Sequence, residues 1–381
     1  MDILNIWDMT RVNIRLKLEF LNEVNRSIKL KFKSQPRAWK KFYPNREIPF
    51  GSFKNVLKPS AHNKIFVPLE IFMKIINDLN ISKEKFQENI TAYKTAGGIN
   101  YIEKPVLPIL INPVFHMLFA HHIGDGTVTN PMQGRLPYFG YRQYNEFYRL
   151  AYIYKLEYIF GKIVYKKDYL RKSTMVYCPP VLSTLFFKYY NLKVTDFLSD
   201  IARIPSFLFG SDKKNLLAIL VAFIIDEGHI DSTEIVINLK NRALIEDLER
   251  ICTILGYRCR VTQTESEIAK GYVRLHILRE GMKNFYEDYL ELNKKYSIID
   301  LGWKGEKIKI SFKIKERKII RKKGNSKLIL DILKGEFLTV NQIAERINMT
   351  RQGVRYHIHN LLNRGEIRIL DNKPLNWIYG V

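Results

Sequence analysis

Two stretches of nine residues determine the architecture of this chain: LFAHHIGDG at residues 118–126 and LVAFIIDEG at residues 220–228. Each has Leu in the first position, Ala in the third, an acidic residue in the eighth and Gly in the ninth. The acids are Asp125 and Glu227. A pattern that occurs twice in one chain is more informative than a single motif, and it predicts two related structural units.

The segments after the two stretches are predicted to follow the same order of elements, αββαββα. In the second segment, Leu244, Leu248, Ile251 and Leu255 recur at helix spacing, whereas residues 235–239 alternate as in a strand. We therefore expect an α+β core at residues 113–300, built as a pseudo-twofold pair of halves at 113–210 and 211–300.

Small residues at matching positions allow two helices to pack closely, and Ala120, Gly124 and Ala222 fit this role beside Leu118 and Leu220. Close packing would bring the two acids together. Each acid also lies at the negative end of a helix dipole, so the pair forms a site that a divalent cation would stabilise. The Gly after each acid allows a sharp turn into the next strand.

This double pattern resembles the LAGLIDADG family of homing endonucleases and related maturases, in the version with two motifs in one chain. The resemblance covers about residues 113–300. It implies that each half presents a saddle-shaped antiparallel sheet to the major groove of double-stranded DNA. It also implies that Asp125 and Glu227 are the catalytic residues and the ligands of Mg²⁺ or Mn²⁺ in phosphodiester hydrolysis. Two halves in one chain imply an active monomer.

The chain departs from the family pattern at three positions. Asp226 replaces a residue that is usually small; it is a candidate third metal ligand or a sign of a relaxed helix contact. His121 and His122 replace aliphatic residues. Together with His116 they are interpreted as interface or surface histidines rather than as a zinc cluster, because neighbouring helix residues face different ways.

Family members place basic or polar residues around the acids. The counterparts that we select here, as DNA-binding candidates, are Arg142, Gln143, Lys240, Asn241, Lys167 and Lys270. For any one of these lysines, an ordinary solvated side chain is the alternative.

The chain has 62 Lys and Arg against 38 Asp and Glu, a formal net charge of +24. Such an excess favours a polyanionic partner, with nucleic acid ahead of an acidic membrane surface. Residues 301–325 are interpreted as a basic strand and linker. Within them, Lys307, Lys309, Lys313 and Lys315 alternate with apolar residues and predict a strand with one lysine face. This face either contacts phosphates or is simply solvated.

Residues 326–381 resemble a winged helix-turn-helix domain. Three helices are predicted at 326–333, 340–347 and 350–363, with Thr350 as the cap of the third, followed by a hairpin. The third helix is predicted to turn the following residues outward, toward a DNA groove: Arg351, Gln352, Arg355, Tyr356 and His359. A helical bundle used for protein contact is the alternative.

Residues 1–112 are predicted to form a basic, mainly helical domain that ends at the proline-rich connector EKPVLPILINP. No apolar run approaches the roughly 18 residues of a membrane span, and the N-terminus lacks the pattern of a secretory signal. We therefore expect a cytoplasmic protein that does not enter membranes. Three cysteines without CxxC spacing predict neither a disulfide framework nor a thiolate zinc site.

Three functions are weighed on this basis. A site-specific double-stranded DNA endonuclease comes first, since both acids are present. The second is a non-cleaving DNA-binding transcriptional regulator built on the same kind of domain, in which such acids are typically lost. The third is an RNA maturase, because nothing in the sequence distinguishes RNA from DNA as the partner.

Overall fold

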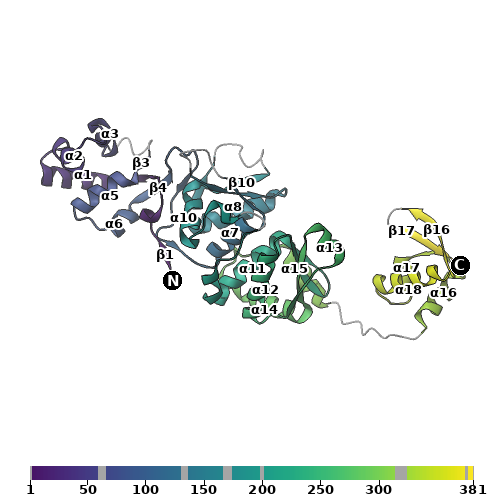
Figure 1. Cartoon of the computed structure of the whole chain (residues 1–381). Helices are drawn as coiled ribbons and strands as arrows, with labels where there is room; N and C mark the ends of the chain where they lie inside the picture. Colours follow the sequence, from purple (N-terminus) through teal and green to yellow (C-terminus); the bar gives the residue numbers. More distant parts are fainter. Residues whose placement is uncertain are drawn as a thin grey trace. The chain divides into compact units, whose positions relative to one another are not determined.

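The computed structural model describes residues 2–58, 66–129, 136–165, 174–197, 201–313, 324–373 and 376–380. The chain divides into two compact units, Met1–Lys313 and Ile314–Val381 (Figure 1). One hydrophobic core extends through the first unit, from Ile6 to Ile308. The fold is α+β with several small antiparallel sheets. The domain boundaries predicted inside the first unit, at residues 112/113 and 210/211, stay predictions.

Helices predominate in the N-terminal segment, as predicted, but it also contributes most of a five-stranded sheet. Its helices are α1 (Leu18–Phe32), α2 (Gln35–Phe42), α3 (Phe50–Val56), α5 (Leu69–Asp78) and α6 (Lys83–Glu88). Its strands are β1 (Ile3–Leu4), β2 (Val12–Leu16), β3 (Val67–Pro68), β4 (Ile90–Thr95), β5 (Tyr101–Glu103) and β6 (Ile109–Leu110). The sheet order is β3-β2-β4-β5-β9, and β9 (Lys162–Val164) belongs to the next segment of the chain. The N-terminal segment and the first predicted half therefore share a sheet.

The first half has the predicted order αββαββα. Its elements are α7 (Pro113–Ile123), β7 (Gly126–Thr129), β8 (Tyr138–Arg142), α8 (Glu146–Phe160), β9, β10 (Met175–Tyr177) and α10 (Pro180–Tyr190). The sheet of this half has the order β10-β8-β7. It contains three strands because β9 pairs with β5 instead.

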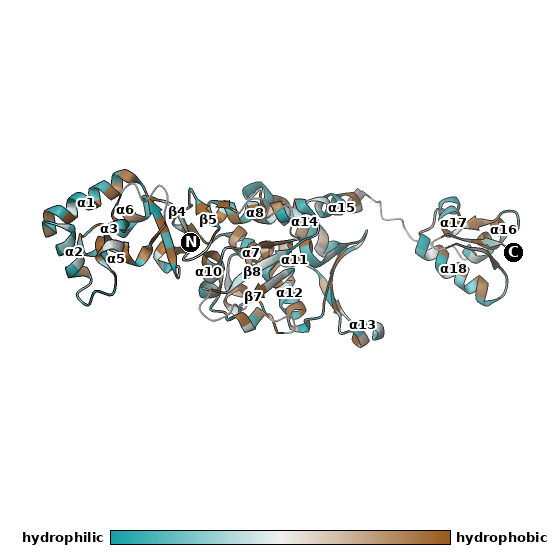
Figure 2. Cartoon of the chain, turned by 90° about the horizontal axis from the view of Figure 1, so that it is seen from above, coloured by the Kyte–Doolittle hydropathy of each residue, from teal (hydrophilic) through white to brown (hydrophobic). Residues whose placement is uncertain are grey.

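The second half repeats this order with one added helix. Its elements are α11 (Lys213–Glu227), β11 (Gly228–Ile230), β12 (Glu234–Leu239), α12 (Arg242–Leu255), β13 (Cys259–Thr262), α13 (Glu265–Lys270), β14 (Val273–Leu278) and α14 (Arg279–Lys295). Its sheet has the order β11-β12-β14-β13. The added helix α13 lies at the tip of the β13–β14 connection (Figure 2).

Helices α7 and α11 lie side by side in the first unit (Figure 1). The side chains predicted at their interface, Leu118, Ala120, Leu220 and Ala222, are at most 1% exposed. A Cβ added to Gly124 would lie 3.1 Å from Oδ2 of Asp226, which is tighter than most real contacts. A side chain at position 124 would therefore require Asp226 to move by a few tenths of an ångström.

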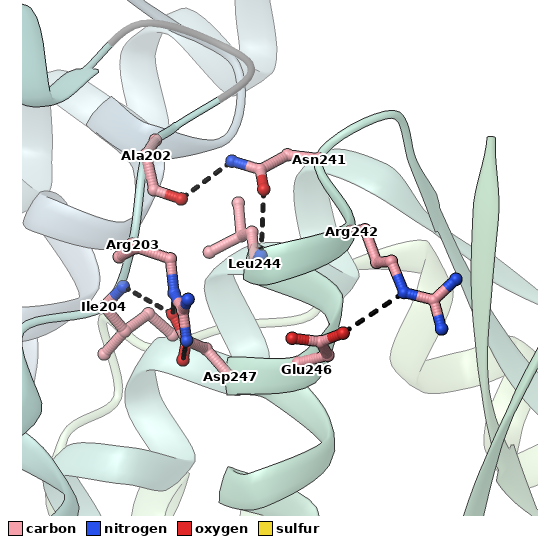
Figure 3. A network of polar contacts seen from close by, with 8 residues as sticks. All are labelled: Ala202, Arg203, Ile204, Asn241, Arg242, Leu244, Glu246 and Asp247. Carbon is pink, nitrogen blue, oxygen red and sulfur yellow. Dashed lines mark hydrogen bonds and ion pairs between the residues drawn. The ribbon is translucent and has the colours of Figure 1, made fainter. Parts of the chain in front are cut away.

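The connection between the halves is fastened to α12 by a buried polar network (Figure 3). Arg203 donates two hydrogen bonds of 2.7 Å to the carboxylate of Asp247, and the Ile204 amide donates a third of 3.0 Å. Asn241 caps α12 by accepting from the Leu244 amide at 3.0 Å and donates to the Ala202 carbonyl at 2.7 Å. These contacts hold residues 202–204 against the first two turns of α12 and the residue before it.

The strand predicted at residues 307–315 is wrong, because residues Trp303–Lys313 form helix α15. Lys304, Ile308 and Ser311 are buried, which is a helical repeat, whereas Ile310 is 56% exposed. The alternation of Lys and Ile fitted a strand, but burial follows the 3.6-residue period. Lys307 therefore lies over the Trp303 ring, and Lys309 lies 3.9 Å from Glu306. Lys315 is outside the described residues, and of Lys313 only the backbone is described.

The second unit consists of α16 (Asn325–Leu333), β15 (Leu338–Thr339), α17 (Val340–Arg346), α18 (Arg351–Asn363), β16 (Arg368–Lys373) and β17 (Asn376–Gly380). Thr350 caps α18 as predicted, by accepting from the Gly353 amide at 3.1 Å. Val354, Ile358 and Leu361 are buried in a separate small core. The residues predicted to face outward are all exposed: Arg351, Gln352, Arg355, Tyr356 and His359. The last two strands pair as a hairpin.

Among the described residues, no helix combines the length and apolar character that crossing a bilayer requires.

Candidate active site

The two predicted acids lie where the two central helices end. Gly124 ends α7 and Asp125 follows it, while Glu227 is the last residue of α11. A Cβ on Gly126 would lie 2.1 Å from the His122 carbonyl oxygen, and one on Gly228 would lie 2.4 Å from that of Ile224. Only glycine fits at these two positions, so the chain can leave each helix directly after the acid and start a strand.

The two acids crowd one another in a partly buried place. Burial, together with the negative charges of Asp226 and Glu227, raises the pKa of Asp125 to about 8. Burial and the charge of Asp226 also raise the pKa of Glu227, while a hydrogen bond with Asp125 opposes this rise. The charge of Glu227 therefore reaches the Asp125 side chain, and negative charge outweighs positive charge where the two helices end.

The positive charge of Lys304 acts on both acids and lowers the pKa of each. Lys304 was not among the residues predicted from the sequence. It is 8% exposed, and its Nζ donates to the carbonyl oxygens of Ile224 and Ile225, at 2.8 and 2.6 Å. It thus satisfies the last turn of α11. Burial lowers the pKa of Lys304, and the three carboxylates oppose the change. Residue 304 is distant in sequence from both motifs. The helical spacing of residues 304, 308 and 311 is the sequence feature that would place Lys304 on the buried face of α15.

Asp226 is held by the other half of the core rather than turned to solvent. Its side chain is 0% exposed. His121 Nδ1 lies 2.8 Å from Oδ2, and the Tyr141 hydroxyl donates to Oδ1 at 2.8 Å. Both oxygens are occupied by residues of the first half. This placement favours a structural role between the motif helices over the predicted role of third metal ligand.

The other two histidines are buried and neutral, not at the surface. His116 Nδ1 lies 2.7 Å from the Tyr190 hydroxyl, and burial lowers the pKa of His116 to about 4. His122 Nε2 lies 2.7 Å from the Tyr152 hydroxyl, and burial lowers the pKa of His122 as well. His116 and His122 therefore pack inside the first half, against α10 and α8, whereas His121 lies between the halves, in contact with Asp226.

Among the described DNA-binding candidates near the acids, Gln143 contacts an acid through its side chain, and the Arg142 amide donates to the Asp125 carbonyl at 3.5 Å. The Gln143 side-chain amide donates to Asp125 Oδ2. Arg142 is exposed at the end of β8, next to Gln143. Lys240 is exposed and lies over the Tyr272 ring, and Lys270 is exposed at the end of α13. Lys167 lies outside the described residues.

The remaining candidate, Asn241, is a wrong prediction for DNA contact. It is 5% exposed, and both ends of its side-chain amide are used inside the protein (Figure 3). Its position directly before a predicted helix indicates an N-cap, since Asn is among the preferred N-cap residues.

Each of the two sheets has one face that is turned away from the core. These faces were not predicted from the sequence. In the second half, Ile235, Ile237 and Leu275 point to the core, so the residues between them lie on the other face. That face carries Val236, Asn238, Arg260, Thr262, Arg274 and His276. In the first half the corresponding face carries Thr127, Tyr138, Arg142, Met175 and Tyr177. Most of these side chains are polar, basic or aromatic, Val236 and Met175 are apolar, and the acid Glu234 lies on the same face as Val236.

The acids fit a divalent metal only in part. No group of three or more His, Cys, Asp or Glu side chains suited to a metal ion occurs in the described ranges. Asp125 and Glu227 offer hard carboxylate oxygens at neighbouring helix ends, and a cation would relieve the negative charge that, together with burial, raises both pKa values. The pair fits Mg²⁺ or Mn²⁺ when water and phosphate oxygens complete the coordination.

No family model matches the chain, and no curated protein matches it in sequence. Solved structures of I-DmoI, a LAGLIDADG homing endonuclease, are similar to about half of it. Mesophilic variants of I-DmoI match at 16% identity over 46% of this chain and 88% of that one, with a TM-score of 0.34. I-DmoI in complex with DNA and Mn matches at 16% identity over 45% and 93%, with a TM-score of 0.32. A substituted I-DmoI with its target DNA and Mg matches at 14% identity over 46% and 94%, with a TM-score of 0.33.

Proposed function

We propose that this protein is a site-specific endonuclease of the LAGLIDADG homing type, which binds double-stranded DNA and hydrolyses a phosphodiester bond in each strand. The observation that carries the proposal is the placement of Asp125 and Glu227 where two helices that pack side by side end, with the pKa of both acids raised. A purely structural helix contact gains nothing from such crowding. A site that receives a divalent cation and a phosphate does.

In this account Asp125 and Glu227 hold Mg²⁺ or Mn²⁺, which supplies Lewis-acid stabilisation of the phosphate and an activated water. Gln143 orients Asp125 by donating to its carboxylate. Lys304 is anchored by two backbone carbonyls, so its ammonium has a fixed place beside the acids. There it offsets negative charge that develops on a phosphate. Asp226 keeps the helix ends in register through His121 and Tyr141.

The open faces of the two sheets are the DNA-reading surfaces in this account. Arg142 on one face, and Arg260 and Arg274 on the other, supply bidentate donors that suit guanine or phosphate. The second unit adds Arg351, Arg355 and Gln352 on the exposed side of α18, in the manner of a recognition helix. The formal net charge of +24 supports backbone binding along the DNA.

The test is to incubate the full chain with a pooled random duplex library, with Mg²⁺ and in parallel with a chelator. Sequencing of cut ends and of bound fragments then separates cleavage from binding. We expect staggered cuts at one defined sequence that need Mg²⁺. Enrichment of one bound duplex without any cut, with Mg²⁺ or Mn²⁺, would replace the endonuclease by the non-cleaving regulator. Preference for a folded RNA over every duplex would favour the maturase.

A further inference from the structure

A cavity of about 380 Å³ lies between the two halves of the first unit. Helix α8 forms one wall, with Tyr148, Tyr152, Tyr154 and Lys155. The second half contributes Ile225 and the segment at residues 297–302, which includes Asp300. This size is typical of sites for small molecules, and it exceeds the roughly 150 Å³ that accommodates benzene. We call it the α8 pocket.

Lys155 is the feature of the α8 pocket that calls for a ligand. It is 4% exposed and lines the cavity. Within the described part of the chain, its ammonium has no hydrogen bond and no ion pair within 4 Å. The carboxylates of Asp226 and Asp300 act on it only at longer range, and burial lowers the pKa of Lys155 to about 8. The ammonium of Lys155 opens into the cavity, so an acceptor that enters the cavity can pair with it.

The remaining walls define what kind of acceptor fits. Six of the lining residues are aromatic, since Tyr141, Phe147 and His121 join the three tyrosines of α8. Flat aromatic walls favour a planar ring, which packs by stacking or edge contacts. Asp300 forms no ion pair with Lys155 within 4 Å, and its Oδ1 accepts from the Gly302 amide at 2.9 Å and from the Tyr289 hydroxyl at 3.2 Å. The Lys155 ammonium among aromatic side chains is complementary to a ligand with an aromatic ring and one negative charge.

We propose that the α8 pocket binds a small aromatic carboxylate, whose carboxylate pairs with the Lys155 ammonium and whose ring lies among the tyrosines. The proposal does not depend on DNA cleavage. Two residues of the wall, His121 and Tyr141, also hold Asp226 beside the acids. The occupant therefore touches side chains that position the ends of the motif helices.

The experiment uses the full chain and three probes: benzoate, benzamide, which has the ring without the charge, and acetate, which has the charge without the ring. Calorimetry and saturation-transfer NMR measure binding. We expect saturable binding of one benzoate with a dissociation constant on the order of 1 mM, as a ligand of this size allows. Benzamide and acetate should bind at least ten times more weakly.

Three variants assign the site. Lys155→Met should abolish benzoate binding, whereas Lys162→Met, at an exposed lysine on β9, should leave it unchanged. Ala151→Phe keeps Lys155 but narrows the cavity, so it should also abolish benzoate binding. It tests the site independently if Lys155→Met does not fold. Equal binding of benzoate and benzamide, binding that survives both pocket variants, or no saturable binding would each overturn the proposal.

Discussion

His121 Nδ1, near the end of α7, lies 2.8 Å from the Asp226 carboxylate, near the end of α11. This contact joins the two motif helices one residue before Glu227. The Tyr141 hydroxyl of β8 donates to the other oxygen of the same carboxylate. A carboxylate therefore occupies a place where close helix packing ordinarily needs a small side chain. It is accommodated because Gly124 faces it.

Asp226→Ala should lower the free energy of unfolding by about 3 kcal/mol, because it leaves the buried groups of His121 and Tyr141 without an acceptor. The measurement is urea denaturation of the full chain. Glu291→Ala, at an exposed acid on α14, is the control and should change stability by less than about 0.5 kcal/mol. Similar stability of the two variants would contradict the structural role of Asp226.

Asp125→Asn should stabilise the metal-free protein at pH 8. The folded-state pKa of Asp125, about 8, exceeds its ordinary value of 3.8, so the folded protein holds an extra proton between these values. Stability therefore falls as the pH rises through that interval, and the variant lacks this contribution. Thermal denaturation in chelator between pH 5 and pH 9 measures the difference, and Mg²⁺ should raise the melting temperature of the parent protein more than that of the variant. Parallel pH profiles would count against the crowded acid pair.

Lys304→Met should lower the free energy of unfolding by about 2 kcal/mol, because the carbonyls of Ile224 and Ile225 lose a charged donor. Lys309→Met, on the same helix, removes only an exposed lysine that lies 3.9 Å from Glu306 and should cost less than about 0.5 kcal/mol. Chemical denaturation of both variants checks the contrast. Equal losses would show that Lys304 does not hold the end of α11.

Arg355→Ala should reduce the salt dependence of DNA binding by about one unit of log-log slope if α18 contacts phosphates, and should weaken sequence preference if it contacts a base. Lys334→Ala, beside Asp331 on the C-terminal side of α16, is the matched control and should leave the slope unchanged. The measurement is fluorescence anisotropy with a labelled duplex over a range of salt. An unchanged slope for Arg355→Ala would favour the protein-contact alternative for the second unit.

Local periodicity predicted most elements well. The residues predicted to share a helix face, Leu244, Leu248, Ile251 and Leu255, all lie in α12, which Gly256 ends with a φ of 79°. Alternation misled at residues 307–315, where Ile308 and Phe312 suit a helix as well as a strand. A short basic segment fits both periods, and packing against the core decides between them.

The candidate site was predicted in part. Asp125 and Glu227 were predicted because each follows an apolar helical segment and precedes a Gly, a pattern that can be recognised within nine residues. Lys304 was not, because its position beside the acids depends on how α15 packs against α11, which no neighbouring residue encodes. Asn241 was misassigned because its polarity was interpreted as function, although its place before a helix predicts a cap. The pairing of β9 with β5 likewise depends on tertiary packing.

The most direct test of the account is cleavage by the double variant Asp125→Asn/Glu227→Gln, compared with the parent protein on the duplex selected from the library. Both changes keep the size and hydrogen-bonding shape of the side chain and remove the charge. The account predicts that the parent cuts both strands in Mg²⁺, and that the variant binds the same duplex with at least equal affinity and cuts neither strand. Cleavage by the variant at the rate of the parent would contradict it, because the acids at the ends of α7 and α11 would then have no part in hydrolysis.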